Sequence, residues 1–499
     1  MNNGNINNNN KNNTNRVRAV APVPVAATPR VIYDIPFSSV IEAWIDCERN
    51  KRSSNSCTKF RWHAARDLVA LWQQMRTATY VPLKSMCFMV KVPVLREVWA
   101  GAFRDRVAHH WEALRFGPLI EKYFVEVGDV SMNCRKGYGS LRAVQTMEKS
   151  IYEFSEGYTR DDCYIVGGDF SNFFMSIDKA MLWEFLEFLV MDEYTGPDIQ
   201  ALLYMMRTTL FHRCQENYYR KSPVEMWRDL PPRKSLFHMD GLPIGNLPSQ
   251  LWANLVGAVF TSWVIHRKKV NGFIIFVDDW RALFRSLDDG RRFLEEAKAF
   301  LRDDLHVTLH PDKVYLQHYS KGTKMVGAVI KPGCNRSVRQ AAASALHSWA
   351  LRGLSRNHIA VAKFRKFLIA NAAPRPVPGT RVTRPGRTYI ANRTRGHFIK
   401  AMLDFNARYA SDRERVEALE RIRASINSYL GLMCHYNSYK VRRRICEKYI
   451  IPGWGKYLYF VEDFTKCVIK AEYNRLYTLR RKLKNGRYAR KFLRPKWQG

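Results

Sequence analysis

The side chains with the clearest chemistry are the carboxylates of Asp278 and Asp279, which are adjacent in the sequence. They follow the apolar run 273–277 and precede a second apolar run, 282–284. This pattern predicts a buried strand, a tight turn that carries both acids, and a second buried strand. Adjacent acids repel each other unless a cation lies close to them. An ordinary polar turn also uses Asp, so this segment alone assigns no function.

A third carboxylate ends another predicted strand. Residues 164–168 are mostly apolar and lead directly to Asp169. If the two strands lie side by side, Asp169 and Asp278 meet, and three carboxylates then offer the hard oxygen ligands that Mg²⁺ prefers. Two such ions, about 4 Å apart, hold the attacking and leaving oxygens of an in-line phosphoryl transfer. The acids therefore predict a two-metal polymerase site with two Mg²⁺ ions, or Mn²⁺ in their place.

Three segments around these acids resemble motifs A, B and C of reverse transcriptases, in the family's order. They read DFSNFF at 169–174, GLPIGNLPSQ at 241–250 and FVDD at 276–279. The resemblance extends from about residue 91 to about residue 439. It implies an α+β right-hand polymerase with α/β fingers, an antiparallel-sheet palm and an α-helical thumb. It also implies an RNA-directed DNA polymerase, a nucleotidyltransferase that uses deoxynucleoside triphosphates to copy template RNA into cDNA.

The resemblance assigns roles to further residues. The segment 131–140 resembles the fingers motif that touches the incoming triphosphate, and its guanidinium and ammonium groups suit phosphate oxygens. By itself, it is also compatible with any basic turn. A phenylalanine five residues after the first acid would exclude the 2′-hydroxyl of a ribonucleotide, although a plain core residue is the alternative. The residues implied to bind nucleotide are Arg135, Lys136, Phe174, Ile244, Gly245 and Gln250.

Metal, proton and primer contacts complete the set that the resemblance implies. Phe170 joins the three aspartates at the metals, and Lys313, at the end of a segment that resembles motif D, is placed to protonate departing pyrophosphate. A solvated lysine after a turn is an equal alternative for Lys313. Residues 322–327 resemble the primer-grip hairpin. The implied primer-grip residues are Met325, Val326 and Gly327.

Motif B indicates a particular type of reverse transcriptase. Ile244 and Gln250 stand where most relatives carry Gln and Pro, a pattern that resembles the enzymes of diversity-generating retroelements. Those enzymes make error-prone cDNA from a template-repeat RNA for mutagenic retrohoming, with frequent errors opposite adenine. A branched apolar side chain cannot make the polar contacts of an amide, which relaxes discrimination by a few kcal/mol at most. The resemblance also implies a basic accessory variability determinant protein as a partner.

The first residues give a separate indication. Ten of the first fifteen are Asn, and the stretch 4–20 resembles the Asn-rich variable segment of the target proteins of such systems. Asn codons begin with two adenines. We expect the start of the reading frame to overlap the template repeat, whereas a polar disordered tail is the simpler alternative.

Charge and composition favour a nucleic-acid partner. The chain has 81 Lys and Arg against 45 Asp and Glu, a net charge of +36, with 46% hydrophobic residues for its cores. Such an excess fits nucleic acid first and an anionic membrane surface second. No apolar run is long enough to span a bilayer and no signal-peptide core is evident. The ten cysteines form no C-x-x-C pair, which makes a zinc ribbon unexpected. We expect a cytoplasmic protein, encoded by a bacterium or a phage.

The chain divides into five expected regions. Helical periodicity at 64–77, 182–189 and 199–210 and the motif order support this division. The regions are a disordered Asn-rich tail (1–30), fingers (31–160), a palm (161–335) with a fingers insertion at about 181–240, a connection and helical thumb (336–470) with a basic loop (373–400), and a basic aromatic tail (471–499).

Two other functions remain open at this point. A retron-like or defence-associated reverse transcriptase shares the three acids, although motif B argues against it. An RNA-binding maturase-type protein would use the same basic surfaces with polymerisation as a secondary activity. The presence of all three carboxylates favours the enzyme.

Overall fold

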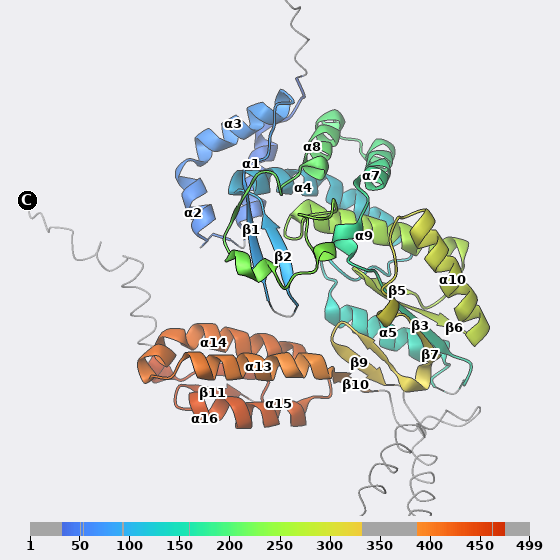
Figure 1. The fold of residues 1–499 in the computed structure, drawn as a ribbon, viewed down its shortest axis with the longest axis vertical. Helices are drawn as coiled ribbons and strands as arrows, with labels where there is room; N and C mark the ends of the chain where they lie inside the picture. Colours follow the sequence, from blue (N-terminus) through green and yellow to red (C-terminus); the bar gives the residue numbers. More distant parts are fainter. Residues whose placement is uncertain are drawn as a thin grey trace, which may run out of the picture.

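The strands predicted beside the aspartates form one antiparallel sheet. The computed structural model describes residues 32–331 and 387–474, apart from residues 50, 53, 92, 93, 159 and 462. Within this part of the chain, four strands lie in the order β5-β6-β3-β7 (Figure 1). Each neighbouring pair is antiparallel. The strands are β3 (Tyr164–Asp169), β5 (Ile274–Phe276), β6 (Asp279–Phe284) and β7 (Tyr315–His318).

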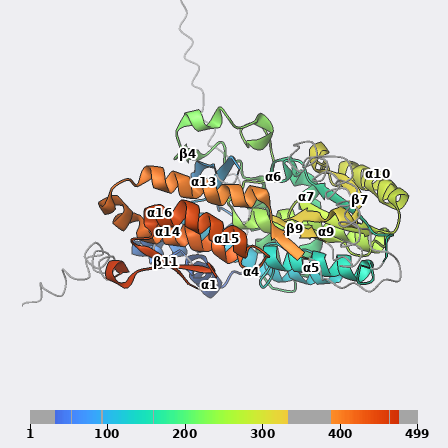
Figure 2. The same cartoon turned by 90° about the horizontal axis from the view of Figure 1, so that it is seen from below.

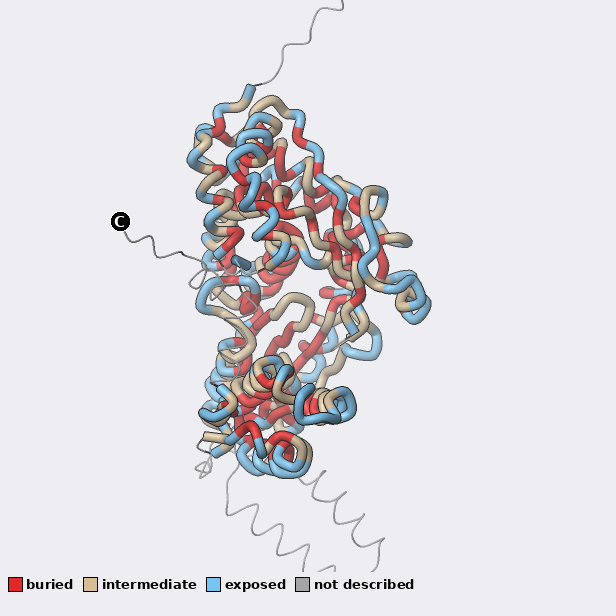
Figure 3. The backbone as a smooth tube through the Cα atoms, turned by 90° about the vertical axis from the view of Figure 1, so that its left-hand side faces the viewer, coloured by how far each residue is buried: buried red, intermediate tan, exposed pale blue. Residues whose placement is uncertain are grey.

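The two faces of this sheet pack against different helices, because successive side chains of a strand point to opposite faces. Ile165 belongs to a core cluster that contains the buried residues of α5 (Ser140–Phe154). Val166, the next residue, belongs to the largest cluster, together with α10 (Leu287–Asp303). Figure 3 shows the buried residues gathered in the interior of the fold. The sheet is therefore covered on both faces, and its acids lie where β3 ends and β6 begins.

Helices enclose the largest core cluster. The periodic segments 64–77, 182–189 and 199–210 are helical, as their spacing predicts. The helix after motif B is apolar on nearly all sides, which is typical of a helix surrounded by the rest of the protein. The helices of this region are α1 (Phe37–Glu48), α2 (Asn55–Trp62), α3 (Ala64–Arg76), α4 (Phe103–Glu126), α6 (Phe173–Ser176), α7 (Lys179–Glu193), α8 (Ile199–Phe211) and α9 (Leu247–Ser262).

A second, smaller sheet lies beside the turn of motif B. Its order is β2-β1-β4, and it packs on a third core cluster built around Trp99. The carboxylate of Glu97 is fully buried there and accepts hydrogen bonds from the indoles of Trp99 and Trp227, both at 2.8 Å. This carboxylate anchors the loop before motif B to the sheet. The strands are β1 (Ser85–Val90), β2 (Arg96–Ala100) and β4 (Tyr218–Arg220).

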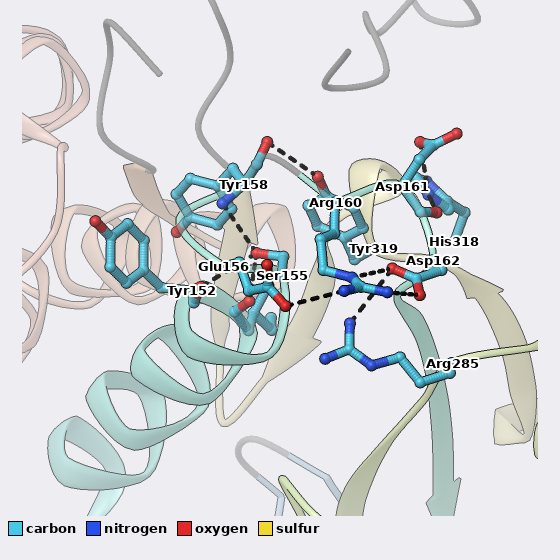
Figure 4. Close-up of polar contacts among 11 residues, drawn as sticks. Tyr152, Ser155, Glu156, Tyr158, Arg160, Asp161, Asp162, Arg285, His318 and Tyr319 are labelled. Carbon is cyan, nitrogen blue, oxygen red and sulfur yellow. Dashed lines mark hydrogen bonds and ion pairs between the residues drawn. The ribbon is translucent and has the colours of Figure 1, made fainter. Parts of the chain in front are cut away.

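The end of β3 that is remote from Asp169 is fixed by a polar cluster (Figure 4). Arg160 pairs with Asp162 at 2.6 Å, and Arg285 reaches the same carboxylate at 3.3 Å. The hydrogen bonds from Arg160 hold the pKa of Asp162 down to about 2. Tyr158 and Tyr319 stack with ring centroids 6.3 Å apart. These contacts join the end of α5 to the beginning of β3 and the end of β7.

The C-terminal part combines helices with two small sheets. Its helices lie below β1 and β2 in Figure 1 and are grouped together in Figure 2, on the side away from α7 and α10. One sheet has the order β10-β9-β8, and the other is a hairpin of two strands. The strands are β8 (Thr323–Met325), β9 (Ala328–Lys331), β10 (Arg387–Ile390), β11 (Leu458–Val461) and β12 (Lys466–Ile469). The helices are α13 (Asn392–Arg408), α14 (Asp412–Met433), α15 (Tyr439–Ile445) and α16 (Ile451–Trp454).

Two expectations for this region are wrong. The described part of the basic loop 373–400 is regular: residues 387–390 form β10, paired with β9, and residues from Asn392 onward form α13. The segment 336–470 is not wholly helical, because β11 and β12 pair within it. Strand β10 forms because it pairs with β9, which is distant in the sequence. Strands β11 and β12 form a short hairpin whose register partners Leu458 and Ile469 are buried in the core cluster of this region.

Some predictions concern residues outside the described part. The Asn-rich tail 1–30 and the remainder of the basic loop lie there, as does the tail from residue 475 onward. Among the described helices, none combines the length and apolar composition that crossing a bilayer requires.

The described chain is a mixed α and β structure with several small sheets.

Replacing Gly168 should destabilise the central sheet. A Cβ atom at this position would lie 2.3 Å from Cζ2 of Trp280, a fully buried ring that has no room to move. Gly168→Ala should lower the free energy of unfolding by about 1–3 kcal/mol. Gly396→Ala is the control, because nothing lies within 4 Å of a Cβ atom there and alanine favours helix α13 by about 1 kcal/mol. Urea denaturation measures both changes, and equal stability of Gly168→Ala and wild type would contradict the packing.

Candidate active site

The fold brings together the three aspartates that the sequence singles out. Asp169 is the last residue of β3 and is the register partner of Asp279, the first residue of β6. Asp278 lies in the turn just before β6, and its carbonyl oxygen accepts a hydrogen bond from the N–H of Phe170 at 3.0 Å. The ring of Phe170 is buried in the core, 4.9 Å from that of Phe173. Only the backbone of Phe170 can therefore face the acids.

The turn that carries Asp278 has a strained backbone. Val277 has a φ of 61°, which is unusual for a β-branched residue. Its N–H donates to Oδ1 of Asn133 at 2.7 Å, and the amides of Asn133 and Asn254 bond to each other. Both Asn side chains are buried, and Nδ2 of Asn254 also donates to the backbone oxygen of Asn133 at 3.0 Å. This amide pair fixes the turn from the segment 131–140 on one side and α9 on the other.

Sequence reasoning missed the Asn133–Asn254 pair. A polar Asn254 inside the apolar run LWANLVGAVF was an available signal, since a buried amide requires partners. The chain beside Asn133 runs along β5, where the N–H of Met132 donates to the oxygen of Ile275 at 3.0 Å. The segment 131–140 therefore supports the turn that carries Asp278.

Two of the three carboxylates have a cation as partner. Nζ of Lys313 lies 2.6 Å from Oδ1 of Asp169, and Nη1 of Arg281 lies 2.5 Å from Oδ1 of Asp279. Asp278 forms no ion pair with any described residue. Burial raises the pKa of Asp278 to about 6, and the nearby charges of Asp169 and Asp279 add to this shift. Burial also raises the pKa of Asp279, although Arg281 opposes that effect. Uncompensated negative charge is therefore concentrated at Asp278.

The donor set fits Mg²⁺ with two protein carboxylates. In the described part of the chain, no three acidic, His or Cys side chains are placed as a complete ligand set. Mg²⁺ is usually bound by one or two carboxylates together with substrate phosphates, so Asp169 and Asp278 suffice. One oxygen of Asp279 is already bonded to Arg281, which leaves that residue the weakest of the three expected ligands.

Motif B is wedged between motif A and the smaller sheet. The N–H of Leu242 donates to the oxygen of Phe174 at 2.6 Å, and the N–H of Trp99 donates to the oxygen of Ile244 at 2.7 Å. Gly245 has a φ of 117°, and a Cβ atom on it would lie 2.6 Å from the oxygen of Trp99. The side chain of Ile244 packs partly buried against the third cluster. Both accounts of Ile244, nucleotide selection and packing of the turn, are compatible with this position.

The expected phosphate contact of Arg135 is contradicted. Its side chain is almost fully buried and forms two hydrogen bonds to Glu121, at 2.9 and 2.6 Å, and an ion pair with Asp129 at 2.8 Å. Its guanidinium also lies 3.8 Å from the ring centroid of Tyr138. With its donors engaged in this way, Arg135 shapes the turn. Lys136, the next residue, is exposed.

The remaining predicted residues lie at the edge of this site. Gln250 is exposed near the start of α9, and its Oε1 lies 3.8 Å from the thiol of Cys134. Val326 and Gly327 form the tight turn between β8, which ends at Met325, and β9, and the primer contact of these three residues stays a prediction. Val326 and Gly327 both have positive φ, and the oxygen of Gly327 accepts a hydrogen bond from the N–H of Ala391 at 2.8 Å. The backbone hydrogen bond from Ala391, the residue that precedes α13, therefore fixes this turn.

Comparison with known proteins gives no family assignment. No family model matches the chain, and no curated protein matches it. Apo telomerase from Candida tropicalis, truncated from its C-terminal domain, is similar at 10% identity and a TM-score of 0.35, over 54% of this chain and 59% of that one. Telomerase from Candida albicans in complex with a fragment of telomeric RNA is similar at 9% identity and a TM-score of 0.36, over 75% of this chain and 63% of that one.

In both cases the chain spans less than two thirds of the telomerase chain that it matches. The TM-scores and the identities are low. A functional proposal therefore depends on the residues of this chain and on their arrangement.

The uncompensated charge at Asp278 should make stability depend on pH. Between pH about 4 and 6 the folded state binds more protons than the unfolded state, so the free energy of unfolding should fall as pH rises through this window. Above pH 6, Asp278→Asn should be more stable than wild type by on the order of 2 kcal/mol, and the difference should vanish below pH 4. Denaturation without Mg²⁺ measures this, with the exposed Asp288→Asn as the control. A pH-independent difference would contradict the raised pKa.

Proposed function

We propose that the chain is an RNA-directed DNA polymerase of the right-hand type, with Asp169 and Asp278 as its metal-binding carboxylates. The observation that carries the proposal is the register of β3 and β6, which sets Asp169 opposite Asp279 and beside Asp278. On this proposal the four-stranded sheet is the palm, the part before it is the fingers, and the helices from α13 onward are the thumb.

The proposed reaction is nucleotidyl transfer. The 3′-hydroxyl oxygen of a primer attacks the α-phosphorus of a deoxynucleoside triphosphate, a new P–O bond forms, and the bond to pyrophosphate breaks. Two Mg²⁺ ions, or Mn²⁺ ions, held at Asp169 and Asp278 would supply stabilisation of the charge that develops on the attacking and leaving oxygens. Lys313, whose ammonium already lies 2.6 Å from Asp169, is near enough to the acids to give a proton to the leaving group.

Positions around the acids support a polymerase with a deoxynucleotide substrate. The N–H of Leu242 in motif B donates to the backbone oxygen of Phe174, whose ring is partly buried, so this position lies where the proposed motifs A and B meet. A ring at this position would occupy the space of a 2′-hydroxyl. The net charge of +36 suits a template RNA and its cDNA, since phosphate contacts dominate affinity for nucleic acid.

The finer part of the proposal is a diversity-generating retroelement enzyme, assisted by a basic accessory protein. It is supported by Ile244 and Gln250 in motif B and by the Asn-rich start of the sequence. Ile244 lies two residues after Leu242, whose N–H donates to the backbone oxygen of Phe174. On this proposal, motif B lies beside the nascent base pair, and Ile244 affects base selection there.

Primer extension tests the polymerase assignment. On an RNA template with Mg²⁺, Asp278→Ala should lose activity by about 10²-fold or more, because the acids hold metal whereas other surfaces hold RNA. RNA affinity should stay near that of wild type. The control is Asp288→Ala, an exposed acid on α10 that should keep full activity. Extension that survives in Asp278→Ala would show that the site is misplaced, and a wild type that binds RNA without extending any primer would favour the RNA-binding alternative.

The substitution Ile244→Gln tests the error-prone assignment. An amide at this position can restore polar contacts near the nascent base pair, so errors opposite template adenine should fall more than errors opposite other bases. The matched control is Ile244→Val, which keeps an apolar branched side chain and should keep the error spectrum. Deep sequencing of cDNA from one adenine-containing template measures both. Lower activity with an unchanged spectrum would assign Ile244 to packing of the turn alone.

A further inference from the structure

A buried arginine connects the acids to the neighbouring β8–β9 hairpin. Arg281 lies two residues after Asp279 on β6, so both side chains point to the same face of the sheet. It is only 5% exposed. Besides the ion pair with Asp279, its Nη1 donates to the oxygen of Trp280 at 2.6 Å. One end of the guanidinium is thus fixed at the acid site.

The other end of Arg281 reaches β8. Its Nε donates to Oγ1 of Thr323 at 3.1 Å, and its Nη2 donates to the backbone oxygen of Lys324. The hydroxyl of Tyr315 also bonds to Oγ1 of Thr323, at 2.6 Å. Gly167 is the register partner of both Arg281 and Tyr315, and its missing side chain leaves the space that the ring of Tyr315 fills, since a Cβ atom there would lie 2.4 Å from that ring. One planar group therefore spans from an active-site carboxylate to the hairpin.

This arrangement keeps the carboxylate of Asp279 in its ion pair with Arg281. A buried guanidinium is unfavourable unless a carboxylate compensates its charge and its donors are satisfied. Asp279 is the carboxylate with which Arg281 forms an ion pair. The pair therefore persists as a unit, and the position of Lys324 is defined relative to that of Asp279.

Two separate hydrogen bonds fix the β8–β9 hairpin. Arg281 holds the backbone of Lys324 in β8, and the N–H of Ala391 holds the turn at Gly327. We propose that Arg281 is a positioning residue that sets the distance between the metal-binding acids and the β8–β9 hairpin, and thereby places the primer terminus against the acids. This inference rests on the proposed polymerase function, in which the hairpin contacts the primer.

Lysine cannot replace Arg281 in this role. A single ammonium keeps the charge beside Asp279, but it cannot bond to Asp279, Thr323 and Lys324 simultaneously, because it lacks the planar fork of the guanidinium. Arg281→Lys should therefore retain the ion pair and lose the connection to the hairpin. Thr323→Val removes one contact of the connection without changing any charge.

Steady-state primer extension by the full chain tests the proposal. Arg281→Lys should raise KM for the primer–template by about tenfold or more, because a displaced hairpin loses contacts that bind the primer in both the ground state and the transition state. KM for the deoxynucleoside triphosphate should change little. Thr323→Val should shift the primer KM in the same direction by a smaller factor. Arg285→Lys is the matched control, since Arg285 follows the same strand at its far end and pairs with Asp162.

A purely structural role gives a different result. It lowers the fraction of active enzyme, and so lowers apparent kcat, while both KM values stay as in wild type. That outcome, or an equal rise in both KM values, would overturn the proposal.

Hydrogen exchange of the peptide that covers residues 322–331 tests the connection without relying on activity. Exchange should be faster in Arg281→Lys than in Arg285→Lys, and equal exchange would overturn the connection itself. Wild type that binds RNA but extends no primer would instead overturn the proposed function.

Discussion

The mutual repulsion of three carboxylates at one edge of an apolar sheet is the constraint on which the rest of this structure depends. Burial and shared negative charge both disfavour ionised acids, and the raised pKa of Asp278 reflects both effects. The chain compensates two of the three charges with its own cations, Lys313 at Asp169 and Arg281 at Asp279. The charge of Asp278 has no ion-pair partner among the described residues. On the proposed function, this remaining charge is the point at which a divalent cation would bind.

The supports around the acids come from segments that are far apart in the sequence. The buried amides of Asn133 and Asn254 hold the strained turn at Val277, and Arg281 connects the acids to the β8–β9 hairpin. Each support satisfies polar groups that burial would otherwise leave unpaired. The same bonds therefore stabilise the fold and fix the geometry of the proposed site. A mutation that removes one of them changes both the stability of the fold and the geometry of the site.

The three acids are unequal in their surroundings, although they look alike in the sequence. Asp278 forms no ion pair with any described residue, Asp169 shares its charge with a half-exposed lysine, and Asp279 is bonded to a buried guanidinium. A lysine that reaches out from the surface is exchanged more easily than a buried arginine whose donors are all engaged. The expected order of importance for metal binding follows from this difference: Asp278 and Asp169 come first, and Asp279 is mainly an anchor.

The sequence by itself determined the features that depend on local pattern. Apolar runs that end in acids indicated the strands around Asp169 and Asp278, and helical periodicity indicated α3, α7 and α8. The β8–β9 hairpin was expected from the resemblance of residues 322–327 to the primer-grip hairpin. Only the tertiary structure decided the partners. It engaged Arg135 with Glu121 and Asp129 and turned Asp279 toward Arg281, and it paired β10 with β9. Hydrogen bonds and ion pairs between distant segments leave no periodic signal, because each depends on how the whole chain packs.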